Sequence, residues 1–75
     1  MYDVLGFEKI DYVNKNGRRI RGTKIYLAFE RENCEGFATT DEYLAESIDY
    51  VPRLGDKVNF FYDKYRKVVK VETII

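Results

Sequence analysis

Basic side chains are concentrated beside aromatic rings at two places in this sequence. The first cluster lies in the acid-free stretch KNGRRIRGTK and consists of Lys15, Arg18, Arg19, Arg21 and Lys24. The second lies near the C-terminus and consists of Lys64, Arg66, Lys67 and Lys70. The tyrosines beside these clusters are Tyr12, Tyr26, Tyr62 and Tyr65. Cations that follow phosphates and rings that stack on exposed bases are the chemistry of single-strand binding, so both clusters are candidate contacts for single-stranded nucleic acid.

The charges of the chain are sorted along its length, although 13 bases balance 13 acids. Residues 30–49 reverse the basic bias and contain Glu30, Glu32, Glu35, Asp41, Glu42, Glu46 and Asp49 against the single base Arg31. One region is therefore expected to attract polyanions and another to repel them. The competing interpretation is a solvated hairpin turn, because charged turns commonly face water without binding anything.

Enzyme chemistry has little support in the sequence. Histidine is absent, which removes the commonest metal ligand and the commonest proton shuttle near neutral pH. The single cysteine, Cys34, lies between Glu32 and Glu35, an unfavourable setting for a thiolate nucleophile. We therefore expect no catalytic residue, no metal, no cofactor and no small-molecule substrate.

A chain of 75 residues is expected to form a single domain, residues 1–75, with a small and mostly aromatic core. No apolar stretch approaches the roughly 20 residues that a membrane-spanning helix requires. The N-terminal residues MYDVLGFEKI lack a basic region followed by an apolar run, so no secretion signal is predicted. A cytoplasmic protein without membrane contact is the expectation.

The first half of the chain predicts a long β-hairpin. Residues 2–13 are rich in β-branched and aromatic types, and a bulge near Glu8 and Lys9 is expected because the apolar phase changes there. The turn signal NKNG follows at residues 14–17, where Asn and Gly tolerate positive φ. Alternation at residues 24–30 predicts a second strand with Tyr26 facing outward, and Gly22 is expected to mark a bend.

The second half predicts three further strands. Residues 36–47 favour a strand over a short helix, although Thr39 and Glu42 have the spacing of a capping box. The segment VPRLGD is a connection, because Pro52 cannot donate a hydrogen bond to a sheet. A fourth strand begins at residue 57, DKYR forms a hairpin loop, and a fifth strand follows in which Val69 and Val71 are expected to face inward.

Five short strands with turns between them predict an all-β domain, a small five-stranded antiparallel barrel. Periodicity does not fix strand order, so an oligonucleotide-binding barrel and an SH3-like barrel both remain possible. Four aromatic residues are predicted to belong to the core or to an interface: Phe29, Phe37, Phe60 and Phe61.

Three segments resemble a known family when they are taken together: YDVLGFEKIDYVNKNGRRIRGTKIYL, CEGFATTDEYL and LGDKVNFFYDKYRKVVKVE. They are similar to small single-stranded DNA-binding proteins of phages and Gram-positive mobile elements, which themselves resemble helix-destabilising proteins of filamentous phage. The resemblance implies an oligonucleotide-binding barrel that coats single strands during DNA replication, often as a dimer. It implies basic contacts from the first cluster and stacking on Tyr26. The acidic residues 30–49 have no clear counterpart in that family.

The sequence thus predicts a sequence-tolerant single-stranded DNA-binding protein, with RNA as an open alternative. The second cluster, together with Tyr65, is included in the predicted contact surface. Phe61 would be exposed on a one-sided barrel, so a homodimer that covers it is expected. The main rival is an SH3-like protein-interaction module whose acidic middle segment docks a basic partner.

Overall fold

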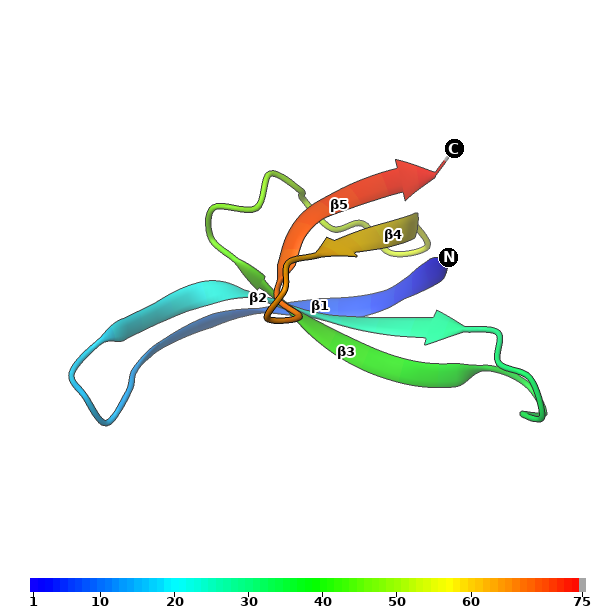
Figure 1. The fold of residues 1–75 in the computed structure, drawn as a ribbon, viewed down its shortest axis with the longest axis horizontal. Helices are drawn as coiled ribbons and strands as arrows, with labels where there is room; N and C mark the ends of the chain where they lie inside the picture. The colour runs from blue at the N-terminus through cyan, green and yellow to red at the C-terminus, as the bar shows by residue number, and fades with distance from the viewer. Residues whose placement is uncertain (75) are drawn as a thin grey trace.

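The computed structural model describes residues 1–74, and their regular structure is entirely β. The strands are β1 (Tyr2–Val13), β2 (Arg19–Phe29), β3 (Ala38–Ala45), β4 (Lys57–Tyr62) and β5 (Val68–Ile74). They form one antiparallel sheet in the order β3-β2-β1-β4-β5 (Figure 1). The predicted all-β class with five antiparallel strands is confirmed. Since residues 1–74 contain no helix, none of them forms a helix long and apolar enough to cross a bilayer.

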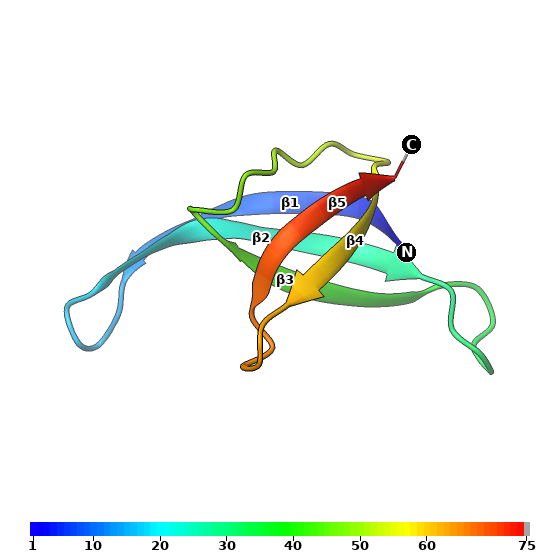
Figure 2. The ribbon, with the colours of Figure 1, turned by 45° about the horizontal axis from the view of Figure 1, so that its top comes forward.

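The sheet curls so that the β4–β5 hairpin lies over β1, β2 and β3 (Figure 2). β1 pairs with β2 along almost its whole length but with β4 only at Tyr2 and Asp3. The edge strands β3 and β5 come into contact. No hydrogen-bonded pairing joins them within residues 1–74, so the described sheet is open. Closure into a barrel stays a prediction.

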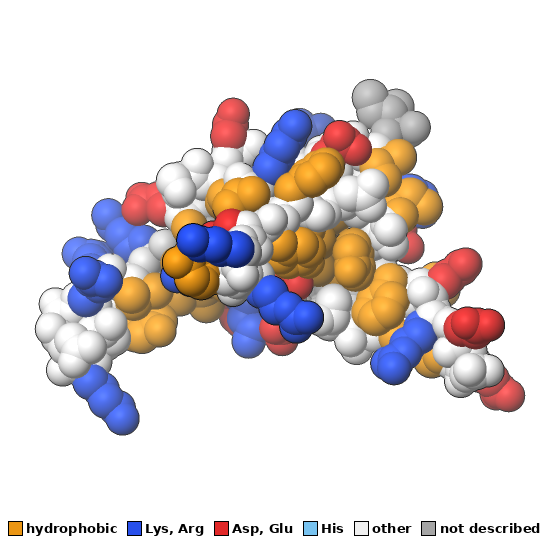
Figure 3. All heavy atoms as spheres, in the orientation of Figure 1, with side chains coloured by type: hydrophobic (Ala, Val, Ile, Leu, Met, Phe, Trp, Pro, Cys, Tyr) orange, Lys and Arg blue, Asp and Glu red, His pale blue; other side chains and the backbone are white. Residues whose placement is uncertain are grey.

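The molecule is elongated, and charge of opposite sign gathers at its two ends. Its longest axis measures 43 Å. The distal halves of β1 and β2 project as an arm, residues 11–21, that has no third strand beside it because β3 pairs with β2 only from Gly22 onward. Figure 3 shows Lys and Arg side chains at the arm end, and Asp and Glu side chains at the end formed by the β2–β3 loop. Hydrophobic side chains are visible in the middle of the molecule, between the β4–β5 hairpin and the other strands.

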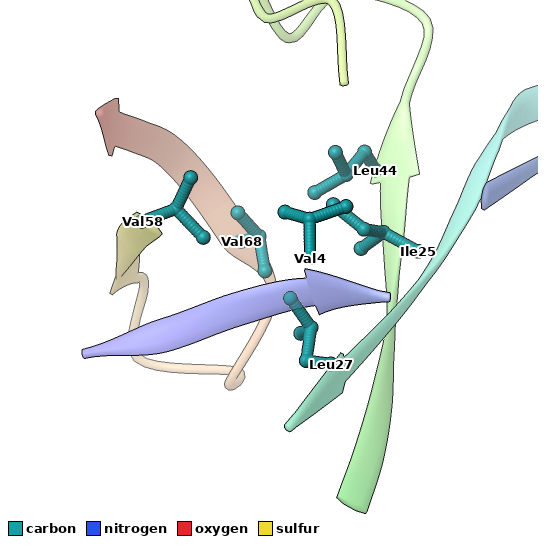
Figure 4. Packing of buried hydrophobic residues seen from close by; sticks show 6 residues of the cluster. All are labelled: Val4, Ile25, Leu27, Leu44, Val58 and Val68. Carbon is teal, nitrogen blue, oxygen red and sulfur yellow. The ribbon is translucent and has the colours of Figure 1, made fainter. Parts of the chain in front are cut away.

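The core is small and draws on every strand. Its buried cluster consists of Val4, Ile25, Leu27, Leu44, Val58 and Val68, which converge between the strands in Figure 4. Ile25, Leu27 and Val58 are completely inaccessible to solvent. Five partly buried residues pack against the cluster: Tyr2, Ile48, Tyr50, Phe60 and Val71. The core therefore lies where the β4–β5 hairpin crosses the other strands and does not extend into the arm.

The bulge in β1 was predicted at the wrong place. The register shifts between Val4 and Gly6 rather than near Glu8 and Lys9. Residues 8–13 continue in regular alternation opposite β2, so Ile10 and Tyr12 lie on the outer face of the sheet. The apolar phase change in the sequence thus reflects an apolar outer patch, to which Ile10, Tyr12 and Ile20 contribute.

The inward position of Val69 was also predicted wrongly. The β4–β5 register shifts between Phe61 and Tyr62, so Tyr62 pairs with Val68. Val68 is consequently buried, whereas Val69 is 52% exposed. Val71 is partly buried against the core, as expected. Phe37 was predicted to belong to the core or to an interface; it is not part of the core, because this ring is 61% exposed on the β2–β3 loop.

Residues 36–47 were predicted to favour a strand over a short helix. They contain the strand β3, and the short-helix alternative is wrong. Gly22 does not end or interrupt β2; it pairs with Ala45 of β3. A Cβ atom at Gly22 would lie 2.4 Å from the backbone oxygen of Leu44 and 2.6 Å from the hydroxyl of Tyr43. Glycine is required here because the Tyr43 side chain lies across β2 and donates a hydrogen bond to the backbone oxygen of Arg21 (2.7 Å).

Candidate nucleic-acid interface

Two hairpin turns carry the predicted basic clusters, and they have the same local design. In the arm turn, the side-chain oxygen of Asn14 accepts hydrogen bonds from the backbone nitrogens of Asn16 and Arg18 (both 3.0 Å). In the β4–β5 turn, Asp63 accepts equivalent bonds from Tyr65 (2.8 Å) and Lys67 (3.0 Å). Asn and Asp favour such turns because their short side chains satisfy backbone donors nearby.

The two turns differ at the position that requires a left-handed backbone. Gly17 occupies it in the arm turn with φ 75°, and Arg66 occupies it in the β4–β5 turn with φ 63°. A side chain in this conformation costs roughly 1–2 kcal/mol, and glycine avoids the cost. Retention of a strained residue often marks a functional position. Arg66 is therefore a stronger candidate contact than its place in a charged turn alone would indicate.

Two of the four basic side chains of the arm already have an acidic partner. Arg19 donates two hydrogen bonds of 2.9 Å to the carboxylate of Asp11, and Arg21 lies 3.8 Å from the same carboxylate. The hydrogen bond from Arg19 lowers the pKa of Asp11, and the same contact raises the pKa of Arg19. Among residues 1–74, Lys15 and Arg18 form no ion pair. The first cluster is thus less available to phosphate than its sequence indicates.

Lys24 and Tyr26 lie on the other face of β2 from Arg19 and Arg21, because side chains alternate along a strand. Lys24 is 3.8 Å from Asp41 and lies over the Tyr26 ring at 5.6 Å. The Tyr26 hydroxyl donates a 2.6 Å hydrogen bond to Glu8, which, together with burial, raises the pKa of Tyr26. Tyr26, 37% exposed, is therefore held by cross-strand contacts on the outer face.

The second cluster is divided between the turn, the outer face and the inner side of the β4–β5 hairpin. Lys64 lies over the Tyr65 ring (5.1 Å) at the turn, and Tyr65 is 70% exposed. Lys70 lies over Phe61 (5.5 Å), its cross-strand partner on the outer face. Arg66 and Lys67 line a hollow between this hairpin and β3. In the part of the chain that the structure describes, no basic residue of the second cluster forms an ion pair.

A row of four rings crosses three strands on the inner side of the sheet. Tyr2 packs against Phe29 at 5.5 Å between ring centroids and against Phe60 at 5.4 Å, and Phe60 lies 6.4 Å from Tyr62. Three of the rings are partly buried, and Tyr62 at the end of the row is 43% exposed. The row contributes to the rim of the core and ends in an accessible ring beside β3.

We call the space between β3 and the β4–β5 turn the seam groove; it comprises two adjoining hollows that share Glu42 and Arg66 in their walls. One has a volume of about 520 Å³ and the other, beside Tyr62, about 540 Å³. The Tyr62 hydroxyl spans the groove and donates a 2.9 Å hydrogen bond to Glu42 Oε1. Burial, with this bond, raises the pKa of Tyr62. A groove with these volumes is large enough for a small ligand group such as a nucleobase.

Comparison of the chain with protein-family models, with curated proteins and with solved structures gives no match.

The structure brings together only part of the predicted contact surface. Arg66 and Lys67 meet at the seam groove, whereas Lys70 faces the other side of the β4–β5 hairpin. The arm residues are divided between the two faces of β2. The sequence interpretation did not place Glu42 at a binding site, left Tyr62 undecided, and assigned Phe29 and Phe60 of the row to the core or an interface. One signal was available: DKYRK repeats the pattern of NKNGR with arginine in place of glycine.

The seam groove offers a cationic wall, an accessible ring and a carboxylate acceptor. Among residues 1–74, no three His, Cys, Asp or Glu side chains are placed to hold a metal ion.

Proposed function

We propose that this protein binds single-stranded nucleic acid, DNA in the first instance, through the seam groove and without catalysis. The observation that carries the proposal is Arg66: a cation in a strained backbone conformation, without an acidic partner among residues 1–74, beside the accessible ring of Tyr62. Phosphates would lie along Arg66 and Lys67, and a base would stack on Tyr62. Stacking of this kind contributes roughly 1–3 kcal/mol per base.

The strand order supports this assignment. An oligonucleotide-binding fold is a five-stranded, partly open barrel in which the loops after the first and the fourth strand bind the nucleic acid. In the order β3-β2-β1-β4-β5, with β5 touching β3, these loops correspond to the arm turn and the β4–β5 turn. We propose that the open sheet is a barrel of this type and that the arm supports binding through Lys15 and Arg18. A role in coating replication intermediates of phages or mobile elements follows from the sequence resemblance alone.

The proposal is tested by fluorescence anisotropy with a labelled 20-mer of thymidine at 50 and 200 mM salt. If Arg66 and Lys67 in the groove and Lys15 and Arg18 in the arm each contact a phosphate, the wild-type affinity should fall by about 50-fold between these concentrations. The double variant Arg66→Glu with Lys67→Glu should lose about 100-fold in affinity at low salt, because two contacts become repulsive.

Two controls separate the groove from net charge. Lys70→Glu changes the charge of the same hairpin on its outer face and should cost only about twofold through the general field. Arg18→Glu with Arg21→Glu tests the arm and should cost about tenfold, less than the groove pair, because Asp11 already occupies Arg21. Absence of binding by the wild type at 50 mM salt would remove the proposal.

A protein-interaction module is the second candidate. It is favoured by the β2–β3 loop, where Glu30, Glu32 and Glu35 are exposed and form no ion pair within residues 1–74. A basic partner could dock there without use of the seam groove. The variant Arg66→Glu with Lys67→Glu would leave such a partner bound.

We also propose that the protein forms a homodimer. Phe61 is 45% exposed on the outer face of the β4–β5 hairpin, away from the seam groove, and a second subunit would cover this ring. Light scattering at tens of micromolar should give twice the chain mass; a monomer mass at that concentration would reject the dimer.

A further inference from the structure

The seam groove contains a fixed hydrogen-bond acceptor. Glu42 is half-buried in β3, and its Oε1 accepts the 2.9 Å hydrogen bond from the Tyr62 hydroxyl. Within residues 1–74, Glu42 forms no ion pair, and no further hydrogen bond engages its carboxylate. An ionised carboxylate accepts hydrogen bonds but donates none. The second oxygen, Oε2, is therefore available to a ligand beside the Tyr62 ring.

The charges around the groove define how a single strand would enter it. Arg66 lines both hollows from the turn side, across from Glu42 on β3, and Lys67 lines one of them beside Arg66. Phosphates are attracted to these two cations and repelled by Glu42. The backbone of a bound strand would accordingly follow the turn, with a base directed toward Tyr62 and Glu42.

The edge of that base must then match an acceptor. Cytosine presents an exocyclic amino donor at the position where thymine and uracil present a keto acceptor. A keto oxygen against a carboxylate leaves two acceptors facing each other without a proton between them. Stacking on a ring and contacts with phosphates do not distinguish cytosine from thymine or uracil, because neither interaction reads base edges.

We propose that Glu42 gives the seam groove a preference for bases with an amino donor, so that cytosine is bound in preference to uracil or thymine at the Tyr62 position. This inference rests on the proposed function, because it assigns a base preference to the same groove. Binding elsewhere along the strand remains sequence-tolerant.

The test compares labelled 12-mers of deoxycytidine and deoxyuridine, which differ in the base at the C4 position, at pH 7.5 and fixed salt. The wild type should bind the cytidine oligomer about tenfold more tightly. Glu42→Gln should reduce this ratio to about twofold, because a carboxamide also donates and its oxygen still accepts from Tyr62. Glu46→Gln is the matched control: it removes the same charge from an exposed position at the base of the arm, outside the seam groove, and should keep the tenfold ratio.

A second variant guards against a structural effect of the first. Tyr62→Phe retains the ring but releases Glu42 from its hydrogen bond, so the ratio should fall to about threefold as the carboxylate loses its fixed position. A merely structural role for Glu42 would lower the affinity for both oligomers equally and leave the ratio at tenfold, which would overturn the inference.

Different results would reject the base preference and the proposed single-strand binding. Equal affinities of the wild type for the two oligomers would overturn the base preference and leave single-strand binding intact. A preference that persists in Glu42→Gln would overturn the assignment to this residue. Absence of binding to either oligomer would remove the function together with the inference.

Discussion

The two basic hairpins have turns of the same kind but different freedom to bind. In the arm, Arg19 and Arg21 face Asp11 across the sheet, so two of its cations are already neutralised. In the β4–β5 turn, Arg66 and Lys67 have no such partner among residues 1–74. Local sequence therefore sets the shape of a turn, whereas the strand opposite decides whether its charges can serve a ligand.

The two hairpins also differ in how closely they are packed against the core. The arm extends beyond the core, with a third strand beside it only from Gly22 inward. The β4–β5 hairpin contributes Val58 and Val68 to the core itself. A groove wall built on buried residues is held in place, which reduces the entropy lost on binding. The arm is held only by the pairing of β1 with β2 and by its turn, so under the proposed function we expect weaker and more salt-sensitive contacts from it.

The largest loss of stability is expected at the base of the arm. Gly22→Ala should lower the free energy of unfolding by about 3 kcal/mol, because the new Cβ would meet backbone and ring atoms of β3 that cannot move independently. Gly6→Ala is the control, since a Cβ there meets no atom within 4 Å. Urea unfolding measures both variants, and similar losses in the two would contradict the close packing of Tyr43 against β2.

The next effect distinguishes the supported hairpin from the projecting one. Val58→Ala should cost about 2 kcal/mol, because it removes two methyl groups from a side chain with no solvent exposure. Val13→Ala, at 64% exposure in the arm, should cost less than about 0.5 kcal/mol. Calorimetric unfolding compares them. Equal costs would mean that the arm is packed as tightly as the core.

Much of the fold was predictable because its signals are local. Asn14 and Gly17 located the first turn, Asp63 located the last, and alternation placed the strands between them. The bulge was misplaced because Ile10 and Tyr12 were assumed to face the core, whereas they form part of an outer patch. Strand order was not predictable, since it depends on which apolar faces meet in three dimensions.

The candidate site was less predictable than the fold for the same physical reason. The pairing of Arg19 with Asp11 depends on hairpin register, which a bulge can shift by one residue. Glu42 and Tyr62 are 20 residues apart and meet only because the sheet curls. A basic stretch in a sequence therefore overstates the charge available to a ligand until its cross-strand partners are known.

Exchanging the residues at the left-handed turn position should sharpen the comparison of the two hairpins. Gly17→Arg should destabilise the protein by about 1 kcal/mol, because the arm turn then carries the strain that Arg66 bears now. Arg66→Gly should stabilise it by about 0.5 kcal/mol, the relief of strain being partly offset by a more flexible unfolded chain. Thermal unfolding measures the two changes.

The affinity for single-stranded DNA should fall in the variant at residue 66 whose stability rises. Arg66→Gly should weaken single-strand binding about tenfold while it stabilises the fold, since a phosphate contact is lost. Lys64→Gly, at a turn position without positive φ, lacks the strain relief and is the control for added flexibility. A variant at residue 66 that is both more stable and equally tight in binding would show that the strained arginine has no part in recognition.

The last effect, which is expected only at alkaline pH, concerns the connection between the two hairpins. The Tyr50 hydroxyl donates a 2.8 Å hydrogen bond to Asp56, whose backbone oxygen accepts from Val4 of β1 (2.8 Å). Burial and the contact with Asp56 raise the pKa of Tyr50 to about 12. In the unfolded chain this hydroxyl ionises near pH 10, so the folded protein retains a proton that the unfolded chain releases. Stability should be unaffected below pH 10 and fall between pH 10 and 12. Tyr50→Phe should lose less stability over that interval in urea unfolding; equal slopes for both proteins would mean that this hydroxyl does not hold the hairpins together.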